Sequence, residues 1–335
     1  MTTALPVGAA LRQGAFVTLA NWPVVVIEFG IEALYKMALG VPIVGGAFMV
    51  AVILGADFGS LVGESVRTTA DLIVASLFNA PVALAAFLGA VGLVAFGGGI
   101  VMFVIKSGTL SVLVQGERVA GDLHRAPLRP EAVRRAYVYR LEVVLANMRH
   151  FGWRAGQLAA TLGLLYLVIG GCYVGAISLG FRSAVESDWG AAWPLLVLFS
   201  TSTGVIAITL VNFLYNILRV IVVTDDCGVL AAVRRMRGFL VADARQVIGI
   251  LAVMSGILTI ATAVSLTATA SLALVGWVPF VGLLVWPLQA AAWILRGLLF
   301  QYMSLATLTA YQTQYRRFTD QQRPASPAEF RVQQA

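Results

Sequence analysis

The chain has 335 residues, of which 59% are apolar or aromatic and only 12% are charged. Soluble domains carry about 25% charged residues, and a soluble chain of this size has too little interior to bury so much apolar surface. The composition therefore excludes a water-soluble globular enzyme, and it excludes disorder except near the C-terminus.

Five long windows contain no Asp, Glu, Lys or Arg. They cover 37–56, 72–105, 155–181, 189–218 and 246–295. A helix needs about 20 apolar residues to cross the hydrocarbon core of a bilayer. The last window would be about 75 Å long as one helix, so it must fold back, and Gly276 and Pro279 mark the expected turn. The sequence thus predicts an all-α, polytopic transmembrane helix bundle of about six spans. The spans are placed near 22–54, 76–105, 156–180, 194–222, 248–275 and 280–310.

The first apolar stretch admits two interpretations. Residues 22–54 are too many for one upright crossing, and Pro42 lies inside them. Either the helix crosses over about 22–44 and continues, which is the assignment adopted above, or 8–36 lies partly along the interface and 37–56 crosses. Asn21 and Asn79 each stand two residues before a Pro, and each is expected to cap and open a helix.

Lys and Arg gather in alternate connections. Residues 1–20, 106–154, 223–247 and the C-terminal tail hold eighteen of the 23 basic residues, whereas the opposite connections hold only Arg67 and Arg182. Basic residues accumulate in cytoplasmic loops, so we expect both termini to be cytoplasmic in a bacterial plasma membrane. The net charge of +7 then reflects topology and contact with anionic lipid headgroups. Membrane lipids are expected partners, and nucleic acid is not.

The cytoplasmic connector 106–154 carries an amphipathic pattern. Apolar residues recur at helical spacing over 132–148, at Val133, Tyr137, Leu141, Val144 and Met148. This spacing predicts an amphipathic cytoplasmic helix between spans two and three. A second amphipathic stretch, 228–245, follows Asp225 and Asp226, which are expected to cap its start. Residues 1–318 are predicted to form a single integral membrane domain, and the polar tail 319–335 to be disordered.

Several polar side chains are predicted to lie within the spans. They are Glu28, Glu32, Lys36, Asn212, Asn216, Arg219, Gln289 and Arg296. Glu28 and Glu32 share one helical face, and unpaired carboxylates are costly in hydrocarbon. We therefore expect them to meet Arg219 and Arg296 in the inner-leaflet half, with the Asn side chains as hydrogen-bond partners. Two interpretations stay open: the cluster lines a substrate or proton path, or it is interhelical pairing with Arg side chains that reach to the interface.

Catalytic signatures are absent from the sequence. There is no HExxH, no Walker GxxxxGK[ST] and no GxSxG motif. The two cysteines, Cys172 and Cys227, are assigned to a span and to a cytoplasmic loop, and their spacing matches neither a zinc site nor a redox pair. The sequence predicts no catalytic residue, no cofactor and no metal. The GxxxG motif of Gly171 and Gly175 is expected to allow close helix packing within the bundle.

One cytoplasmic stretch carries a family resemblance. Residues 222–235, VVTDDCGVLAAVRR, resemble the connector of bacterial six-helix membrane proteins of the YciC type. These proteins are similar to the membrane domain fused to some glycerophosphodiester phosphodiesterases. The entry Asn21-Trp22-Pro23 is also similar to the start of that family, whereas Met236 stands where Ser is usual. The resemblance implies a multi-pass plasma-membrane protein and transfers no catalytic residue.

These observations predict a non-enzymatic, multi-pass plasma-membrane protein. It is expected to act as a scaffold, or as a lipid- or protein-interacting subunit of a membrane complex, with other membrane proteins or a second copy as further partners. The alternative is a transporter or permease component that moves a solute through the polar cluster. An intramembrane enzyme is a third class, but no convergent acid–base groups can be assembled from these residues.

Overall fold

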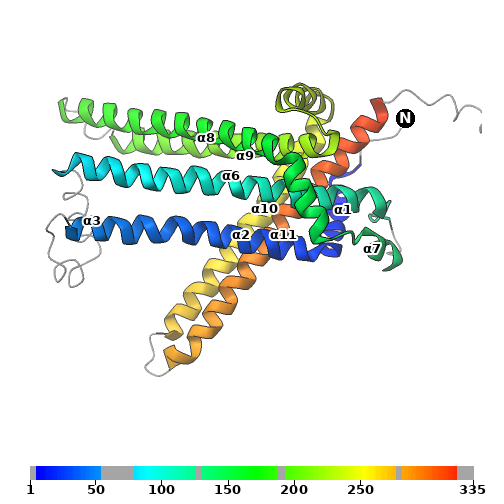
Figure 1. Cartoon of the computed structure of the whole chain (residues 1–335), viewed down its shortest axis with the longest axis horizontal. Coiled ribbons are helices and arrows are strands. Elements are labelled where there is room, and N and C mark those ends of the chain that lie inside the picture. The colour runs from blue at the N-terminus through cyan, green and yellow to red at the C-terminus, as the bar shows by residue number, and fades with distance from the viewer. Residues whose placement is uncertain (1–4, 54–78, 126–129, 187–192, 277–280, 323–335) are drawn as a thin grey trace, which may run out of the picture. The chain divides into compact units, whose positions relative to one another are not determined.

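The computed structural model describes residues 5–53, 79–125, 130–186, 193–276 and 281–322. Every regular element among these residues is helical (Figure 1). The helices are α1 (Val7–Ala20), α2 (Trp22–Val41), α3 (Ala47–Ile53), α6 (Pro81–Ala120), α7 (Pro130–Ala136), α8 (Leu141–Glu186), α9 (Trp193–Asp225), α10 (Val229–Gly276) and α11 (Val281–Gln322). A π-helical turn, Pro42–Gly46, joins α2 to α3. The predicted all-α class is confirmed for this part of the chain.

Four of the described helices are long and apolar enough to cross a membrane. They are Pro81–Ala120, Leu141–Ser183, Trp193–Asp225 and Val229–Ser271. The shortest has 33 residues, which is about 50 Å of helix, so each extends well beyond a ~30 Å hydrocarbon core. The helices agree with the predicted class of membrane protein, and the total of six spans stays a prediction.

The chain divides into two compact units. The first contains Met1–Phe29 together with Ile105–Ala335, and the second contains Gly30–Val104. In the second unit the Tyr35 hydroxyl of α2 donates a hydrogen bond of 2.8 Å to the carbonyl of Ala95 in α6. A Cβ at Gly98 would lie 2.9 Å from the Tyr35 ring, so this glycine lets the ring lie against α6.

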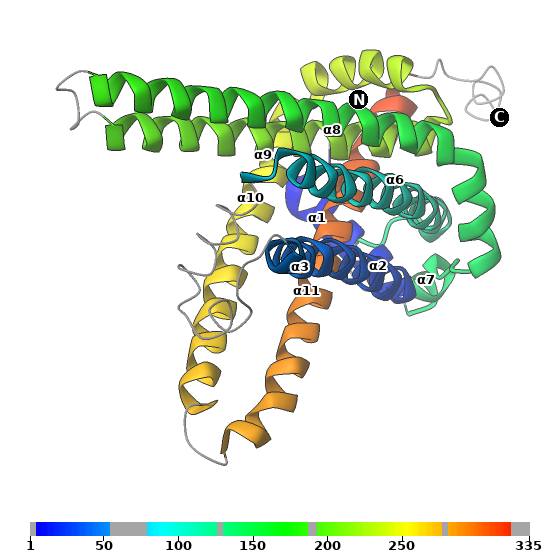
Figure 2. The ribbon, with the colours of Figure 1, turned by 60° about the vertical axis from the view of Figure 1, so that its left-hand side comes forward.

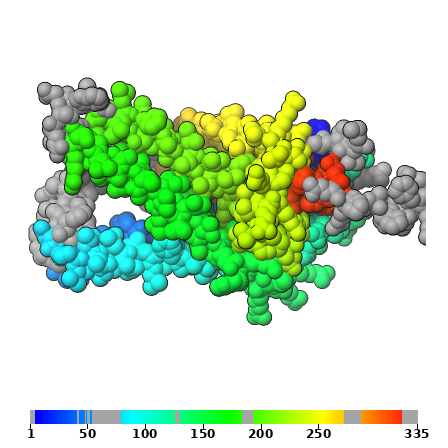
Figure 3. All heavy atoms as spheres, turned by 90° about the horizontal axis from the view of Figure 1, so that it is seen from above, coloured from blue at the N-terminus to red at the C-terminus, as the bar shows by residue number. Residues whose placement is uncertain are grey.

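The core of the first unit lies where α1 meets parts of four longer helices. Its most buried large side chains include Leu110, Ile217, Phe239, Leu305 and Tyr315. We call this part the packed region. It comprises α1, the adjoining residues 21–28, and residues 107–120, 213–223, 232–254 and 301–318 of the four longer helices. Figure 3 shows the beginning of α10 lying against the end of α11, where the Phe239 and Phe318 rings are 5.5 Å apart.

Beyond the packed region the helices form two hairpins, α8 with α9 and α10 with α11, which diverge from each other (Figures 1 and 2). We call residues 163–183, 194–210, 255–271 and 286–300 the far halves of these helices. They expose large apolar side chains such as Leu164, Phe199, Ile206, Ile260 and Leu295. Such exposure is costly in water and ordinary in lipid.

α1 was not predicted, because residues 1–20 were assigned to a cytoplasmic connection. It is a central element of the packed region, with Ala10, Gln13, Gly14, Val17 and Thr18 buried. A Cβ at Gly14 would lie 2.8 Å from the backbone nitrogen of Ala310, and still closer to the carbonyl oxygen of Ala306. Only glycine therefore allows α1 to approach the α11 backbone this closely.

The amphipathic helix predicted over 132–148 is divided in the structure. α7 ends at Ala136, and α8 begins at Leu141. The buried Asn21 side chain lies at the break: its Nδ2 donates to the carbonyl of Ala136 at 2.8 Å, and its Oδ1 accepts from the backbone N–H of Val138 at 3.0 Å. These bonds satisfy backbone groups that a continuous helix would otherwise pair. Asn21 therefore holds the connector rather than capping α2, whereas Asn79 in the similar motif is exposed.

The cap predicted at Asp225 and Asp226 is replaced by ion pairs. Asp225 accepts from the Tyr315 hydroxyl and from Arg235. Asp226 pairs with His150 at 2.9 Å and also with Arg154, and these hydrogen bonds lower the pKa of its carboxyl. The backbone of Asp226 is left-handed, with φ of 49°, a conformation that a short polar residue tolerates. The two acids thus tie the α9–α10 turn to α8 and α11.

Four further expectations concern helix ends and a glycine motif. α10 runs from Val229 through the predicted amphipathic stretch with a kink at Asp243. The turn predicted at 276–279 falls between the end of α10 and the start of α11, and 277–280 lie outside the described residues. The tail predicted from 319 is helical to Gln322, and its remainder also lies outside them. A Cβ at Gly171 or Gly175 would meet nothing within 4 Å, so this motif does not pack against another described helix.

Candidate functional site

A buried ion pair lies in the packed region. Glu28 of α2 is 1% exposed and Arg219 of α9 is 5% exposed. Arg219 Nη2 lies 3.3 Å from Glu28 Oε1. The two residues belong to the predicted set and are 191 positions apart in the chain. The tertiary fold therefore brings together two charges that the sequence had predicted to meet.

Two further helices complete the surroundings of this pair. Gln301 of α11 donates from Nε2 to Glu28 Oε2 at 2.7 Å. The Thr109 hydroxyl of α6 donates to Glu28 Oε1, and Arg219 Nη2 donates to the carbonyl of Lys106. We call Glu28, Thr109, Arg219 and Gln301 the buried polar cluster. Its carboxylate accepts from three donors on three helices, whereas Arg219 Nε has no hydrogen-bond partner among the described residues.

The walls of the buried polar cluster are apolar. Buried side chains of the same hydrophobic core include Val24, Val25, Leu110, Leu113 and Leu305. Removing a charge from water costs several kcal/mol unless a partner compensates. In these surroundings each charge of the pair therefore depends on the other, and the cluster joins α2, α6, α9 and α11.

The remaining predicted residues lie elsewhere. Glu32 and Lys36, in the second unit, pair with each other at 2.9 Å, and the Lys36 side chain is 70% exposed. The Arg296 guanidinium lies over the Phe300 ring, 5.7 Å from its centroid. Gln289 is half-buried on the far half of α11. The residue of α11 that contacts Glu28 is thus Gln301, whereas the sequence had predicted Arg296.

Thr109 and Gln301 were missed by the sequence reasoning. The set predicted from the sequence included the amides of Asn212, Asn216 and Gln289 but neither of these two residues. A Gln in an apolar helix is a usable signal, since a buried amide needs hydrogen-bond partners.

Asn212 and Asn216 line a cavity of about 240 Å³ between α9, α10 and α11. Its walls also include the polar side chains of Thr209, Ser255, Ser304, Thr307 and Tyr311. Asn212 accepts a hydrogen bond from the Tyr166 hydroxyl of α8. Neither Glu28 nor Arg219 lines this cavity, so Asn212 and Asn216 lie apart from the buried polar cluster.

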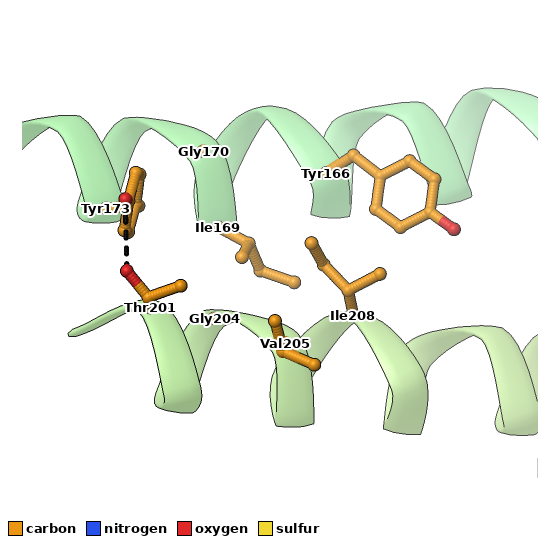
Figure 4. Close-up of a pocket in the computed structure, with 8 residues that line it drawn as sticks. All are labelled: Tyr166, Ile169, Gly170, Tyr173, Thr201, Gly204, Val205 and Ile208. Carbon is orange, nitrogen blue, oxygen red and sulfur yellow. Dashed lines mark hydrogen bonds between the residues drawn. The ribbon is translucent and has the colours of Figure 1, made fainter. Parts of the chain in front are cut away.

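A larger cavity of about 500 Å³ lies between α8 and α9. Figure 4 shows the apolar side chains of Ile169, Val205 and Ile208 in the gap between the two helices. At one end the Tyr173 hydroxyl lies 3.2 Å from the Thr201 hydroxyl. Apart from this pair and Tyr166, the lining is apolar, which suits hydrocarbon and offers no set of groups for chemistry.

Among the described residues, no group of three His, Cys, Asp or Glu is placed to hold a metal ion. Cys172 is exposed and Cys227 is half-buried, and both are free thiols. Partial burial raises the pKa of the Cys227 thiol, which disfavours the reactive thiolate.

The described structure defines an all-helical protein in which several helices have the length and composition of membrane spans, built around a closed ion pair. No protein-family model matches the chain, and neither a curated protein nor a solved structure does.

Proposed function

We propose that this chain is a non-enzymatic, multi-pass protein of a bacterial plasma membrane that serves as a scaffold or as a protein- and lipid-interacting subunit of a membrane complex. Six spans follow when two further passages join the four long apolar helices. One is the passage from α2 through the Pro42–Gly46 turn to α3, and the other is the first part of α11. The resemblance to proteins of the YciC type supports the same count.

The observation that carries the proposal is the division between the packed region and the far halves. Glu28 and Arg219 are buried in the packed region, whereas the two hairpins, which diverge in Figure 2, expose large apolar side chains. Hairpins of this kind leave helix faces free for lateral contact in the bilayer, where association depends on van der Waals packing. The proposal assigns the packed region to the cytoplasmic side, because basic residues are concentrated in the connections 106–154 and 223–247.

Photo-crosslinking tests the proposed lateral contacts. A photoreactive amino acid at Phe199 or Ile260, both exposed on far halves, is expected to give an adduct of discrete mass with a membrane protein or a second copy. The same residue at Trp153, which is 78% exposed but lies outside the far halves, is the matched control and should give no such adduct. If the far-half positions yield lipid adducts alone, these hairpins are not protein-binding surfaces and the scaffold proposal fails.

A transporter is the second candidate, because the cavity at Asn212 and Asn216 is lined by polar side chains at a junction of three apolar helices. The buried polar cluster does not favour it, since Glu28 and Arg219 use each other and the protein around them as partners. In the transporter, water would have to reach the cavity from a membrane surface. In the scaffold, water-soluble reagents would not reach it.

Single-cysteine labelling separates these proposals and tests the orientation. In a background with Cys172→Ser and Cys227→Ser, an impermeant maleimide should label Ser183→Cys in intact cells. It should label Ala146→Cys only after permeabilisation, because basic connections stay in the cytoplasm. Asn216→Cys should stay unlabelled under both conditions. Labelling of Ala146→Cys in intact cells contradicts the orientation, and labelling of Asn216→Cys favours the transporter.

A further inference from the structure

The cavity between α9, α10 and α11 has a closed end and an open end. Tyr311 and Met254 are buried, whereas Thr209, Ser255 and Ser304 are exposed. On α9 the exposed Thr209 and Asn212 precede the buried Phe213, and on α11 the exposed Ser304 precedes the buried Leu308 and Tyr311, so on both helices the exposed residues lie on the side of the far halves. The cavity therefore opens toward the exposed apolar surface of the two hairpins and closes toward the packed region.

An unpaired hydroxyl lies at the closed end. Tyr311 is 2% exposed, it lines the cavity, and its hydroxyl has no hydrogen-bond partner among the described residues. The Tyr311 ring is held by an edge contact with Phe213, with centroids 6.0 Å apart. A buried polar group without a partner costs about 1–3 kcal/mol. A residue that lines the closed end of the cavity thus carries a hydrogen-bonding group that the described residues leave unpaired.

The lining defines the chemistry of that molecule. Amide and hydroxyl groups come from Asn212, Asn216, Thr307 and Tyr311, and no described lining residue is charged. Such walls offer donors and acceptors to hydroxyl and ester groups but no cation for a phosphate. A volume of about 240 Å³ has room for about eight waters, so it admits a small head and not a whole lipid.

We propose that this cavity binds the neutral glycerol-ester head of an acylglycerol, with the acyl chain lying along the apolar far halves of α9 and α10. The glycerol hydroxyls and ester carbonyl reach Tyr311 and the two Asn side chains. The acyl chain of the lipid leaves the cavity at its open end and extends into the hydrocarbon of the bilayer. This site rests on the proposed membrane location and extends the proposed lipid interaction to one lipid class.

Thermal unfolding of the full chain in maltoside micelles tests this site, with mono-oleoylglycerol as the probe. A ligand that binds only the folded state raises the unfolding temperature in a concentration-dependent way. We expect such a rise for the wild-type chain and at least a tenfold higher half-saturating lipid concentration for Tyr311→Phe. Without lipid, Tyr311→Phe should unfold at or above the wild-type temperature, because the hydroxyl that it removes has no partner. Asn216→Leu, on a different helix, should also weaken the response.

Matched controls give each outcome a meaning. Tyr173→Phe, in the other cavity, should keep the full response. Methyl oleate has the same acyl chain without the glycerol, and oleoyl lysophosphatidylglycerol has a charged head. Neither lipid should stabilise the wild-type protein as much as mono-oleoylglycerol does. The site is refuted if Tyr311→Phe keeps the response, if it unfolds earlier without lipid, or if either control lipid works as well. Failure here leaves the cysteine-labelling pattern unchanged, so it is distinguishable from failure of the membrane assignment.

Discussion

Replacing Glu28 by Gln is expected to lower the free energy of unfolding by about 3–5 kcal/mol, the usual cost of breaking a buried ion pair from one side. The reason is that Arg219, 5% exposed, would keep its charge in apolar surroundings without a counter-charge. The measurement is a denaturant titration of the purified protein in detergent, followed by helix content.

A double substitution and a matched control make this result specific. Neutralising both charges, as Glu28→Gln with Arg219→Gln, should recover part of the lost stability, because no uncompensated charge remains. Asp320→Asn, the same change from carboxyl to amide at an exposed position near the end of α11, should cost no more than about 0.5 kcal/mol, as surface substitutions usually do. Wild-type stability in Glu28→Gln would show that the buried polar cluster does not hold the helices together. That result would favour the alternative that these charges line a substrate or proton path.

The second large effect is expected at Gly14. Gly14→Ala should destabilise the protein by about 1–3 kcal/mol, as overpacking does in a close-packed interior. The added methyl would lie 2.8 Å from the Ala310 nitrogen and against the Ala306 carbonyl. Both are backbone atoms of α11, which cannot turn away as a side chain would, so α1 has to move.

Gly8→Ala in the same helix is the control. A Cβ at Gly8 meets nothing within 4 Å, and Ala is the better helix former by about 0.8–1.0 kcal/mol. The two substitutions should therefore change the unfolding free energy in opposite directions in the same titration. Equal effects would mean that α1 does not pack against α11 through Gly14.

Parts of the site followed from the sequence, and others needed the fold. Glu28 and Arg219 were recognisable because charge in an apolar helix is costly and demands a partner. The same reasoning assigned Arg296 to the pair, yet that side chain lies over Phe300 while Gln301 reaches Glu28. Arg296 and Gln301 are five residues apart, so they lie on different faces of α11. Which of these faces contacts α2 depends on how the helices pack.

Asn21 shows a second limit. It stands in the same kind of motif as Asn79, and local rules treat both as helix caps. The Asn21 amide is instead used by the backbone of Ala136 and Val138, more than a hundred positions away. Local spacing contains no information on a partner so distant, so the break between α7 and α8 could not be predicted.

The sequence by itself determined that the protein is helical and that several of its helices suit a membrane, because long charge-free stretches must satisfy their backbone internally when lipid surrounds them. The tertiary structure alone decided that α1 is a core helix, that one carboxylate is closed by three donors, and that a polar cavity opens between diverging hairpins. These features depend on contacts between residues far apart in the chain, and helix periodicity constrains faces without choosing the faces that meet.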